Sequence, residues 1–161
     1  MNLNRLGGCL IVATASVGLA ACGSSSKSSA ATTTTSTTLA KAALIARANA
    51  ICTTAQSAAS SITAPKSYQD PVVAAAYFDQ VAPITDRETE DLLALAPASE
   101  VQAQYTAFTS ARQAANTLLQ TIRQKADAKD ASGLEDLQKV PDAGQKVADA
   151  ATALGASACA Q

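Results

Sequence analysis

Alanine is the most abundant residue of this chain, and it restricts the fold more than any other feature of the sequence. It supplies 39 of the 161 residues, whereas aromatic residues account for only 3%. Alanine has the highest helix propensity of all residues, and 161 residues are enough for one domain. The composition therefore favours a single all-α domain.

Four segments in the second part of the chain have the apolar periodicity of helices, with apolar residues at steps of three and four. The first spans residues 39–62. The second begins at Asp70, a preferred N-cap residue, which is followed by Pro71 at the first helical position. Pro83 lies inside this second helix and is predicted to kink it, because proline lacks the backbone N–H and clashes with the preceding turn.

The third and fourth helices are predicted to begin at capping boxes. Ser99 is followed three residues later by Gln102, and Ser132 is followed three residues later by Glu135. In a capping box the serine hydroxyl accepts a hydrogen bond from the backbone three residues ahead, and the Gln or Glu side chain reaches back. These two spacings place the expected helix starts at the serines.

The last helix has one predicted interruption and one defined end. Pro141 is expected to split it into a short and a longer piece, and Gly155 is expected to stop it. Four helices joined by short connections imply an up-down arrangement. The predicted fold is an all-α antiparallel four-helix bundle with Pro-kinked helices over residues 39–161.

The start of the chain has the pattern of a bacterial export signal. Residues 6–20 are uncharged and mostly apolar, but they are too few for a membrane-spanning helix, which needs about 20 residues. They end in Leu19-Ala20-Ala21-Cys22, which resembles a lipobox. The resemblance implies a lipoprotein signal peptide over residues 1–21, with diacylglycerol on Cys22. The alternative is an ordinary secretory signal that contains a cysteine by chance.

Residues 23–38 consist almost entirely of Ser, Thr, Ala and Gly. Such a segment has little to bury and cannot offset the entropy lost on ordering. Together with the lipidated Cys22, it is predicted to form a flexible tether over residues 22–38. Square-root scaling for flexible linkers gives this tether a reach of roughly 20–25 Å.

The four cysteines leave one possible intramolecular disulfide. Cys9 falls within the predicted signal peptide and Cys22 would carry the lipid, so Cys52 and Cys159 remain. In an oxidising compartment they are expected to pair and to close a loop of about 107 residues. The alternatives are two free thiols or an intermolecular bridge.

The position of Cys52 leaves two arrangements open. Cys52 lies about 13 residues, or roughly 20 Å, into the first helix, whereas Cys159 follows the predicted end of the last helix by only four residues. In an antiparallel pair, the end of the last helix meets the start of the first. Either the C-terminal tail folds back along the first helix, or the first turns of that helix project beyond the bundle.

Composition also excludes several classes of function. The chain has no His, and 12 basic residues stand against 13 acidic ones, for a formal net charge of −1. The charge balance excludes a general nucleic-acid binder. Without His, the commonest metal ligand and general base is missing. We therefore expect no catalytic residue, no metal and no cofactor.

Two acidic segments are interpreted as surface features. Residues 86–91 hold the densest charge cluster, and Arg87 can pair with Asp91 one helical turn later. This cluster is expected to be a solvated helix face. Residues 127–138 superficially resemble a calcium-binding loop, but the sixth and twelfth positions are Ser and Gln instead of the Gly and acidic residue that an EF-hand requires.

Tyr77, Tyr105 and Phe108 lie on apolar stripes at helical spacing and are expected in the core. The alternative hypothesis is that they line a ligand groove between the second and third helices, with the tyrosine hydroxyls as polar contacts.

The overall layout resembles small helical lipoproteins that are common in actinobacteria. The resemblance rests on the lipobox, the Ser/Thr-rich tether, and the segments Ala48-Asn49-Ala50-Ile51-Cys52 and Leu154-Gly155-Ala156-Ser157-Ala158-Cys159. It implies a lipid-anchored protein on the extracytoplasmic face of the cell membrane and transfers no catalytic residue. We therefore expect a non-enzymatic module that binds an envelope protein or a small ligand. The alternative is a carrier of a small apolar ligand between the helices.

Overall fold

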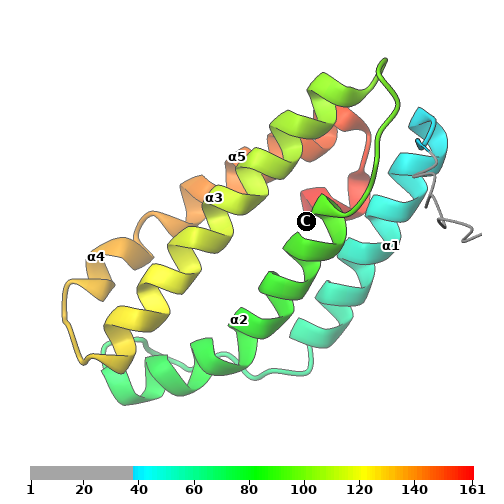
Figure 1. The fold of residues 1–161 in the computed structure, drawn as a ribbon. Helices are drawn as coiled ribbons and strands as arrows, with labels where there is room; N and C mark the ends of the chain where they lie inside the picture. Colours follow the sequence, from blue (N-terminus) through cyan, green and yellow to red (C-terminus); the bar gives the residue numbers. More distant parts are fainter. Residues whose placement is uncertain (1–37) are drawn as a thin grey trace, which may run out of the picture. The chain divides into compact units, whose positions relative to one another are not determined.

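The computed structural model describes residues 38–161 (Figure 1). The predicted signal peptide, Cys22 and the tether up to residue 37 lie outside the described residues. The elements of the described range are α1 (Lys41–Ala59), α2 (Pro71–Leu93), α3 (Gln102–Asp127), α4 (Gly133–Leu137), α5 (Val140–Leu154) and the 3-10 helix η1 (Ser157–Ala160).

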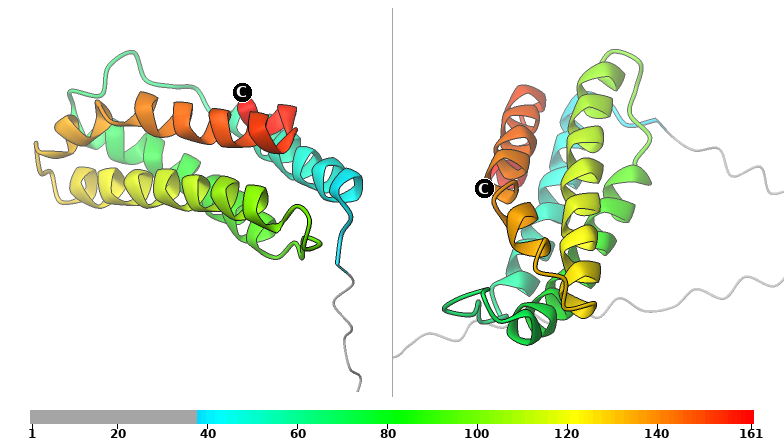
Figure 2. Two further views of the ribbon diagram at one scale, coloured as in Figure 1. Left: turned by 90° about the horizontal axis from the view of Figure 1, so that it is seen from above. Right: turned by 90° about the vertical axis from the view of Figure 1, so that its left-hand side faces the viewer.

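The four long helices form the predicted antiparallel bundle. Helix α1 packs against α2, α2 against α3, and α3 against α5, with successive long helices running in opposite directions (Figures 1 and 2). The short helix η1 contacts both α5 and α1. Helix α1 is therefore joined to α5 through the C-terminal tail and not through a long α1–α5 interface.

Two helix ends, the start of α2 and the end of α5, are formed by the residues that the sequence predicts. The side chain of Asp70 accepts a hydrogen bond of 2.9 Å from the Val72 N–H at the start of α2. Gly155 ends α5 in the left-handed region, with a φ of 93°. A Cβ atom at this glycine would also lie 3.3 Å from Cδ1 of Ile45 on α1. Only glycine meets both requirements without strain.

Both predicted capping boxes are wrong. Helix α3 begins at Gln102, whose N–H reaches the backbone carbonyl of Ser99 at 3.4 Å, and no side chain caps the helix. Ser132 precedes α4 with helical dihedral angles, whereas a capping serine needs an extended conformation. The carboxylate of Asp130 accepts the Ser132 N–H instead, at 2.9 Å.

Pro141 separates two helices as the sequence predicts, whereas α2 continues as one helix through Pro83. Pro141 lies in the first turn of α5 and separates it from α4. Pro83 lies inside α2, which is helical from Pro71 to Leu93. Without an N–H at Pro83, the carbonyl of Asp79 loses its usual helical partner.

The apolar core is divided into two clusters. The first lies at the disulfide end and consists of Leu44, Ala48, Cys52, Leu92, Val101, Tyr105, Phe108, Val147, Ala151, Leu154, Ala156 and Cys159. The second lies where the start of α2 meets the end of α3 and consists of Ala74, Phe78, Ile122 and Ala126. Both clusters and both remaining cysteines lie within residues 38–161, so this range has the core that an independently folding domain requires.

The disulfide joins α1 to the C-terminal tail, as predicted. Cys52 and Cys159 are bonded, with their Cα atoms 5.2 Å apart. The tail folds back along α1, which is the first of the two arrangements that the sequence left open. Gln56 Nε2 donates to the carbonyl of Ala158 at 2.6 Å, and Asn49 Oδ1 accepts the Ala158 N–H at 2.9 Å.

The start of the domain is held against the connection between α2 and α3. The Leu39 N–H donates to the carbonyl of Ala96 at 2.7 Å, and the Ala98 N–H donates to the carbonyl of Leu39 at 2.9 Å. The Leu39 side chain packs on the first core cluster. The chain therefore enters the domain at a fixed point.

Candidate functional site

The three aromatic side chains proposed as a groove do not come together. Tyr105 and Phe108 lie in the first core cluster, with ring centroids 6.2 Å apart. Tyr77 packs on the second cluster beside Phe78, at 5.4 Å between centroids. Tyr105 and Phe108 are core residues, as expected, and Tyr77 is half-buried.

Tyr105 has a structural hydrogen bond. Its hydroxyl donates to the backbone carbonyl of Leu92, near the end of α2, where the chain is about to leave the helix. Burial raises the pKa of Tyr105 to about 12. The hydroxyl therefore stays protonated at neutral pH and holds α2 to α3.

Replacing Tyr105 by Phe tests this role. The variant should lose about 1 kcal/mol of unfolding free energy at pH 7, because the hydrogen bond to Leu92 is lost. With a pKa of about 12 in the folded protein against 10.0 normally, Tyr105 ionises more readily when unfolded, so the wild type loses stability between pH 10 and 12. Urea unfolding at pH 7 and pH 11 should show a smaller fall in unfolding free energy between the two pH values for the variant than for the wild type. Equal declines would contradict this assignment.

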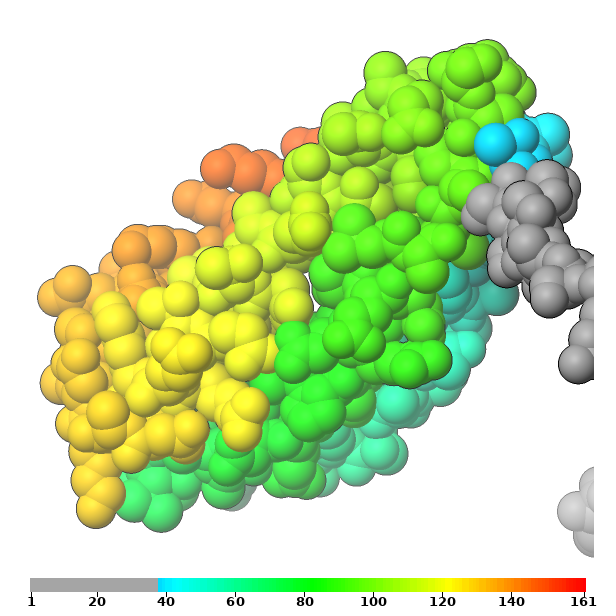
Figure 3. Space-filling model, viewed as in Figure 1, coloured from blue at the N-terminus to red at the C-terminus, as the bar shows by residue number. Residues whose placement is uncertain are grey.

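Between the two core clusters lies a layer of polar side chains on α2 and α3. We call it the polar layer, and it consists of Asp86, Glu88, Thr89, Thr109, Arg112, Asn116 and Gln120. Side chains of α2 and α3 form the face of the molecule that is turned toward the viewer in Figure 3. The polar layer therefore crosses the α2–α3 interface between two apolar regions.

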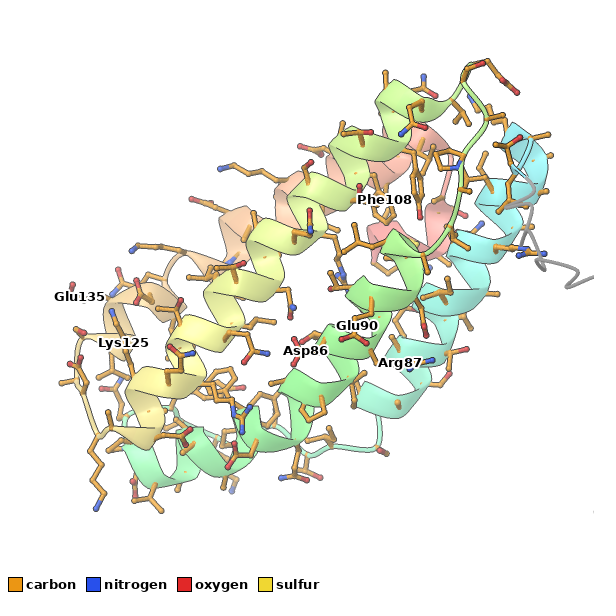
Figure 4. All side chains as sticks on the ribbon, viewed as in Figure 1. Asp86, Arg87, Glu90, Phe108, Lys125 and Glu135 are labelled. Atoms are coloured by element: carbon orange, nitrogen blue, oxygen red, sulfur yellow. A yellow bond between two sulfur atoms is a disulfide. The ribbon has the colours of Figure 1, made fainter. Side chains whose placement is uncertain are left out.

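The polar layer corrects the prediction that residues 86–91 form a solvated face. Arg87 and Asp91 do form the predicted exposed pair, at 3.0 Å. However, Glu88 and Thr89 are each only 6% exposed. Asp86 points from α2 toward α3, and Arg87 lies on the side of α1 (Figure 4). The charged run therefore wraps around α2 and contributes to the interior.

Glu88 and Arg112 form a buried ion pair across the α2–α3 interface. Glu88 Oε2 meets Arg112 Nη2, and the two side chains are 5% and 23% exposed. Burial lowers the pKa of Arg112, although an arginine remains charged at neutral pH. A buried ion pair is costly to desolvate and is rarely the most stable choice for a core. The pair is therefore weak evidence of stabilisation by itself.

The remaining members of the polar layer are hydrogen-bonded with one exception. The Asp86 carboxylate accepts hydrogen bonds of 2.8 Å from Asn116 Nδ2 and Gln120 Nε2. The hydroxyls of Thr89 and Thr109 donate to carbonyls one turn earlier in their own helices. Asn116 Oδ1 is buried without a partner.

An apolar groove of about 450 Å³ lies between α1 and α2 and borders the polar layer. We call it the α1–α2 groove. Its α1 wall is formed mainly by Ala50, Ile51, Ala55 and Ala58, and its α2 wall by Pro83, Ile84, Arg87, Glu88 and Asp91. Alanines on α1 leave this space open because their side chains are too short to fill it.

The buried ion pair separates the α1–α2 groove from a second hollow. Arg112 lines a cavity of about 130 Å³ between α3 and α5, together with Leu118 and Val147. Glu88 faces the α1–α2 groove. The two partners of the ion pair therefore line different spaces, Glu88 the larger one and Arg112 the smaller one.

A third cavity, beside Tyr68 and Phe78, measures only about 80 Å³. Sites for small molecules usually measure about 300–1,000 Å³. The α1–α2 groove lies within this range, and a hollow of about 310 Å³ on α3 and α5, beside Leu118 and Ala143, just reaches it. Within residues 38–161 no three His, Cys, Asp or Glu side chains gather closely enough to hold a metal. The chemistry available in the groove is an apolar surface with one buried carboxylate.

Sequence reasoning did not single out Glu88 and Arg112, although both occupy positions on buried helix faces. Arg112 follows Phe108 by four residues and precedes Ala115 by three, and Glu88 precedes Leu92 by four. A charged residue at a core step on each of two neighbouring helices is the signal that could have identified the pair.

None of the helices in the described range is both long and apolar enough to span a membrane. A comparison of the chain with protein families, curated proteins and solved structures found no match in any of the three.

Proposed function

We propose that this protein is a lipid-anchored, non-enzymatic binding module on the extracytoplasmic face of the cell membrane. The observation that supports this most is the Cys52–Cys159 disulfide in a domain that follows a lipobox-like sequence ending at Cys22. Disulfides persist in oxidising compartments outside the cytoplasm. The lipid would hold the domain at the membrane through the tether.

Binding is favoured over catalysis by the side chains that line the α1–α2 groove. Its ionisable groups are already engaged with one another, Glu88 with Arg112 and Arg87 with Asp91. A nucleophile needs an adjacent base that activates it, and the residues that line this groove include no such pair. The groove offers recognition of shape, apolarity and charge.

A small apolar ligand is favoured over a broad protein partner by the shape of the surface. The groove volume of about 450 Å³ falls within the usual range for small-molecule sites. The large apolar residues exposed in the described range are Val72 and Val73 at one end of α2 and Leu93 at the other. They are too far apart to form one patch of the size typical of protein interfaces. The carrier is therefore our second, more specific candidate.

A Cys22→Ala variant tests the lipid anchor. When the full chain is produced in bacteria grown with radiolabelled fatty acid, the wild type should be labelled and recovered with the membranes, because Cys22 would carry the lipid. The variant should lose the label. Cys9→Ala is the matched control, since Cys9 lies within the predicted signal peptide, and it should retain the label. A labelled Cys22→Ala variant would exclude this anchor.

A further inference from the structure

We propose that the α1–α2 groove binds a small amphipathic cation, a molecule with an apolar body and an ammonium end that meets the carboxylate of Glu88. This inference rests on the proposed carrier function and adds the chemical class of the ligand. It is carried by the geometry of Glu88, by the groove walls and by the distribution of charge.

Glu88 is the buried charged residue of the groove wall. Oε2 is held by Arg112 Nη2, and the Glu88 side chain is only 5% exposed. Because Glu88 lines the α1–α2 groove, a cationic group bound there would lie close to its carboxylate.

The walls of the groove suit the apolar part of such a ligand. Ile51 and Ala55 on α1 face Pro83 and Ile84 on α2. These side chains offer carbon surface, and burying an alkyl chain against them is favourable by about 0.8 kcal/mol per methylene group. An apolar body in the groove would bring its polar end near Glu88, whose carboxylate can accept a hydrogen bond.

The sign of the ligand charge follows from the surrounding groups. All 13 acidic residues lie within residues 38–161, whereas Arg5 and Lys27 lie outside, so this range holds 10 basic residues and has a formal net charge of −3. Of the charged residues that line the α1–α2 groove, two are carboxylates, Glu88 and Asp91, and one is a cation, Arg87, which is paired with Asp91. An anionic ligand would meet the Glu88 carboxylate directly, whereas an ammonium would share it with Arg112.

Three probes with the same alkyl chain test the proposal on residues 38–161. Octylammonium, 1-octanol and octanoate are titrated at neutral pH by isothermal titration calorimetry. Octylammonium should bind at least about tenfold more tightly than octanoate, because a charge-assisted hydrogen bond to Glu88 replaces a like-charge contact. Binding of 1-octanol should lie between the two. If octanoate binds as tightly as octylammonium or more tightly, the proposed ligand class is overturned and the carrier function is left intact. If none of the three probes binds, both the ligand class and the carrier function are overturned.

Two variants locate the site. Ala58→Leu puts a larger side chain at an exposed position of the groove wall and should weaken octylammonium binding about tenfold or more. Ala46→Leu is the matched control, because Ala46 is exposed on α1 and does not line the groove, and it should bind as the wild type does. Unchanged binding by Ala58→Leu would overturn the site.

A charge-neutral double variant tests the part played by Glu88. Glu88→Gln with Arg112→Gln removes both buried charges together, so that neither is left unpaired. This variant should bind octylammonium and octanoate with affinities within about threefold of each other. A preference for octylammonium that survives in the double variant would show that Glu88 does not select the ligand.

Discussion

Replacement of Cys52 or Cys159 by serine should lower the free energy of unfolding of residues 38–161 by about 4–5 kcal/mol. The disulfide closes a loop with a sequence separation of 107 residues, and the chain-entropy model assigns such a loop a stabilisation of this size. The melting temperature should fall by roughly 10–25 °C. Thermal unfolding followed by circular dichroism under non-reducing conditions measures the effect.

The two single variants and the double variant should be equally destabilised, since each removes the same bond. Reducing agent should lower the melting temperature of the wild type and leave that of the double variant unchanged. Losses that add in the double variant would mean that each cysteine acts through its own packing and not through the bridge.

Loss of the disulfide should destabilise α1 before the other helices. This helix packs mainly on α2 and η1, and η1 is held to it by the disulfide and by the Gln56 and Asn49 hydrogen bonds to Ala158. Since α1 also forms one wall of the α1–α2 groove, reduction should weaken ligand binding before the rest of the bundle unfolds. Stability and binding are therefore linked through the same helix.

Replacement of Arg112 by Met should lower the free energy of unfolding by about 3–5 kcal/mol. The substitution preserves much of the side-chain volume but leaves the carboxylate of Glu88 buried, at 5% exposure, without its partner. Denaturant unfolding of residues 38–161 measures the change.

Adding Glu88→Leu to Arg112→Met should restore the wild-type stability or exceed it by about 1–4 kcal/mol, because a well-packed apolar pair avoids the cost of desolvating two charges. Arg87→Met is the matched control, since Arg87 is 74% exposed, and it should change stability by less than about 1 kcal/mol. A double variant no more stable than Arg112→Met alone would mean that the ion pair is retained for stability. The recovered double variant should nevertheless lose the preference for octylammonium, which separates the binding role of the pair from its structural cost.

Local chemistry predicted the parts of the fold that depend on a few neighbouring residues. The Asp70-Pro71 start of α2 and the Gly155 end of α5 were predicted because each requires one conformation of one or two residues. The disulfide followed from counting cysteines, since Cys52 and Cys159 were the two left to pair.

The capping boxes failed because their sequence pattern does not fix the backbone conformation of the first residue. Ser132 already lies in a turn with helical dihedral angles, and Asp130 accepts its N–H. Ser99 lies in the connection that pairs with Leu39 at the start of the domain, a contact about 60 residues away in the chain. Such contacts override a local preference.

The candidate site could not be predicted from the sequence because it depends on how the helices face one another. Glu88 stands in a run of charged residues, where solvation is the expected environment, and only the packing of α3 brings Arg112 to it. The α1–α2 groove arises because the alanines of α1 leave space beside Pro83 and Ile84. Alanine-rich faces are equally compatible with close packing, so the sequence left a groove and a solid bundle as alternatives.

Native mass spectrometry of the full-length protein, isolated from bacterial membranes under non-reducing conditions, tests the proposed carrier function most directly. The account predicts a chain that starts at Cys22 with its lipid, a mass about 2 Da below that of the reduced form for the disulfide, and an additional small cationic molecule that leaves on denaturation. Ala58→Leu should lack this additional mass, and Ala46→Leu should keep it. A protein without any dissociable molecule would contradict the proposal that the α1–α2 groove carries a ligand.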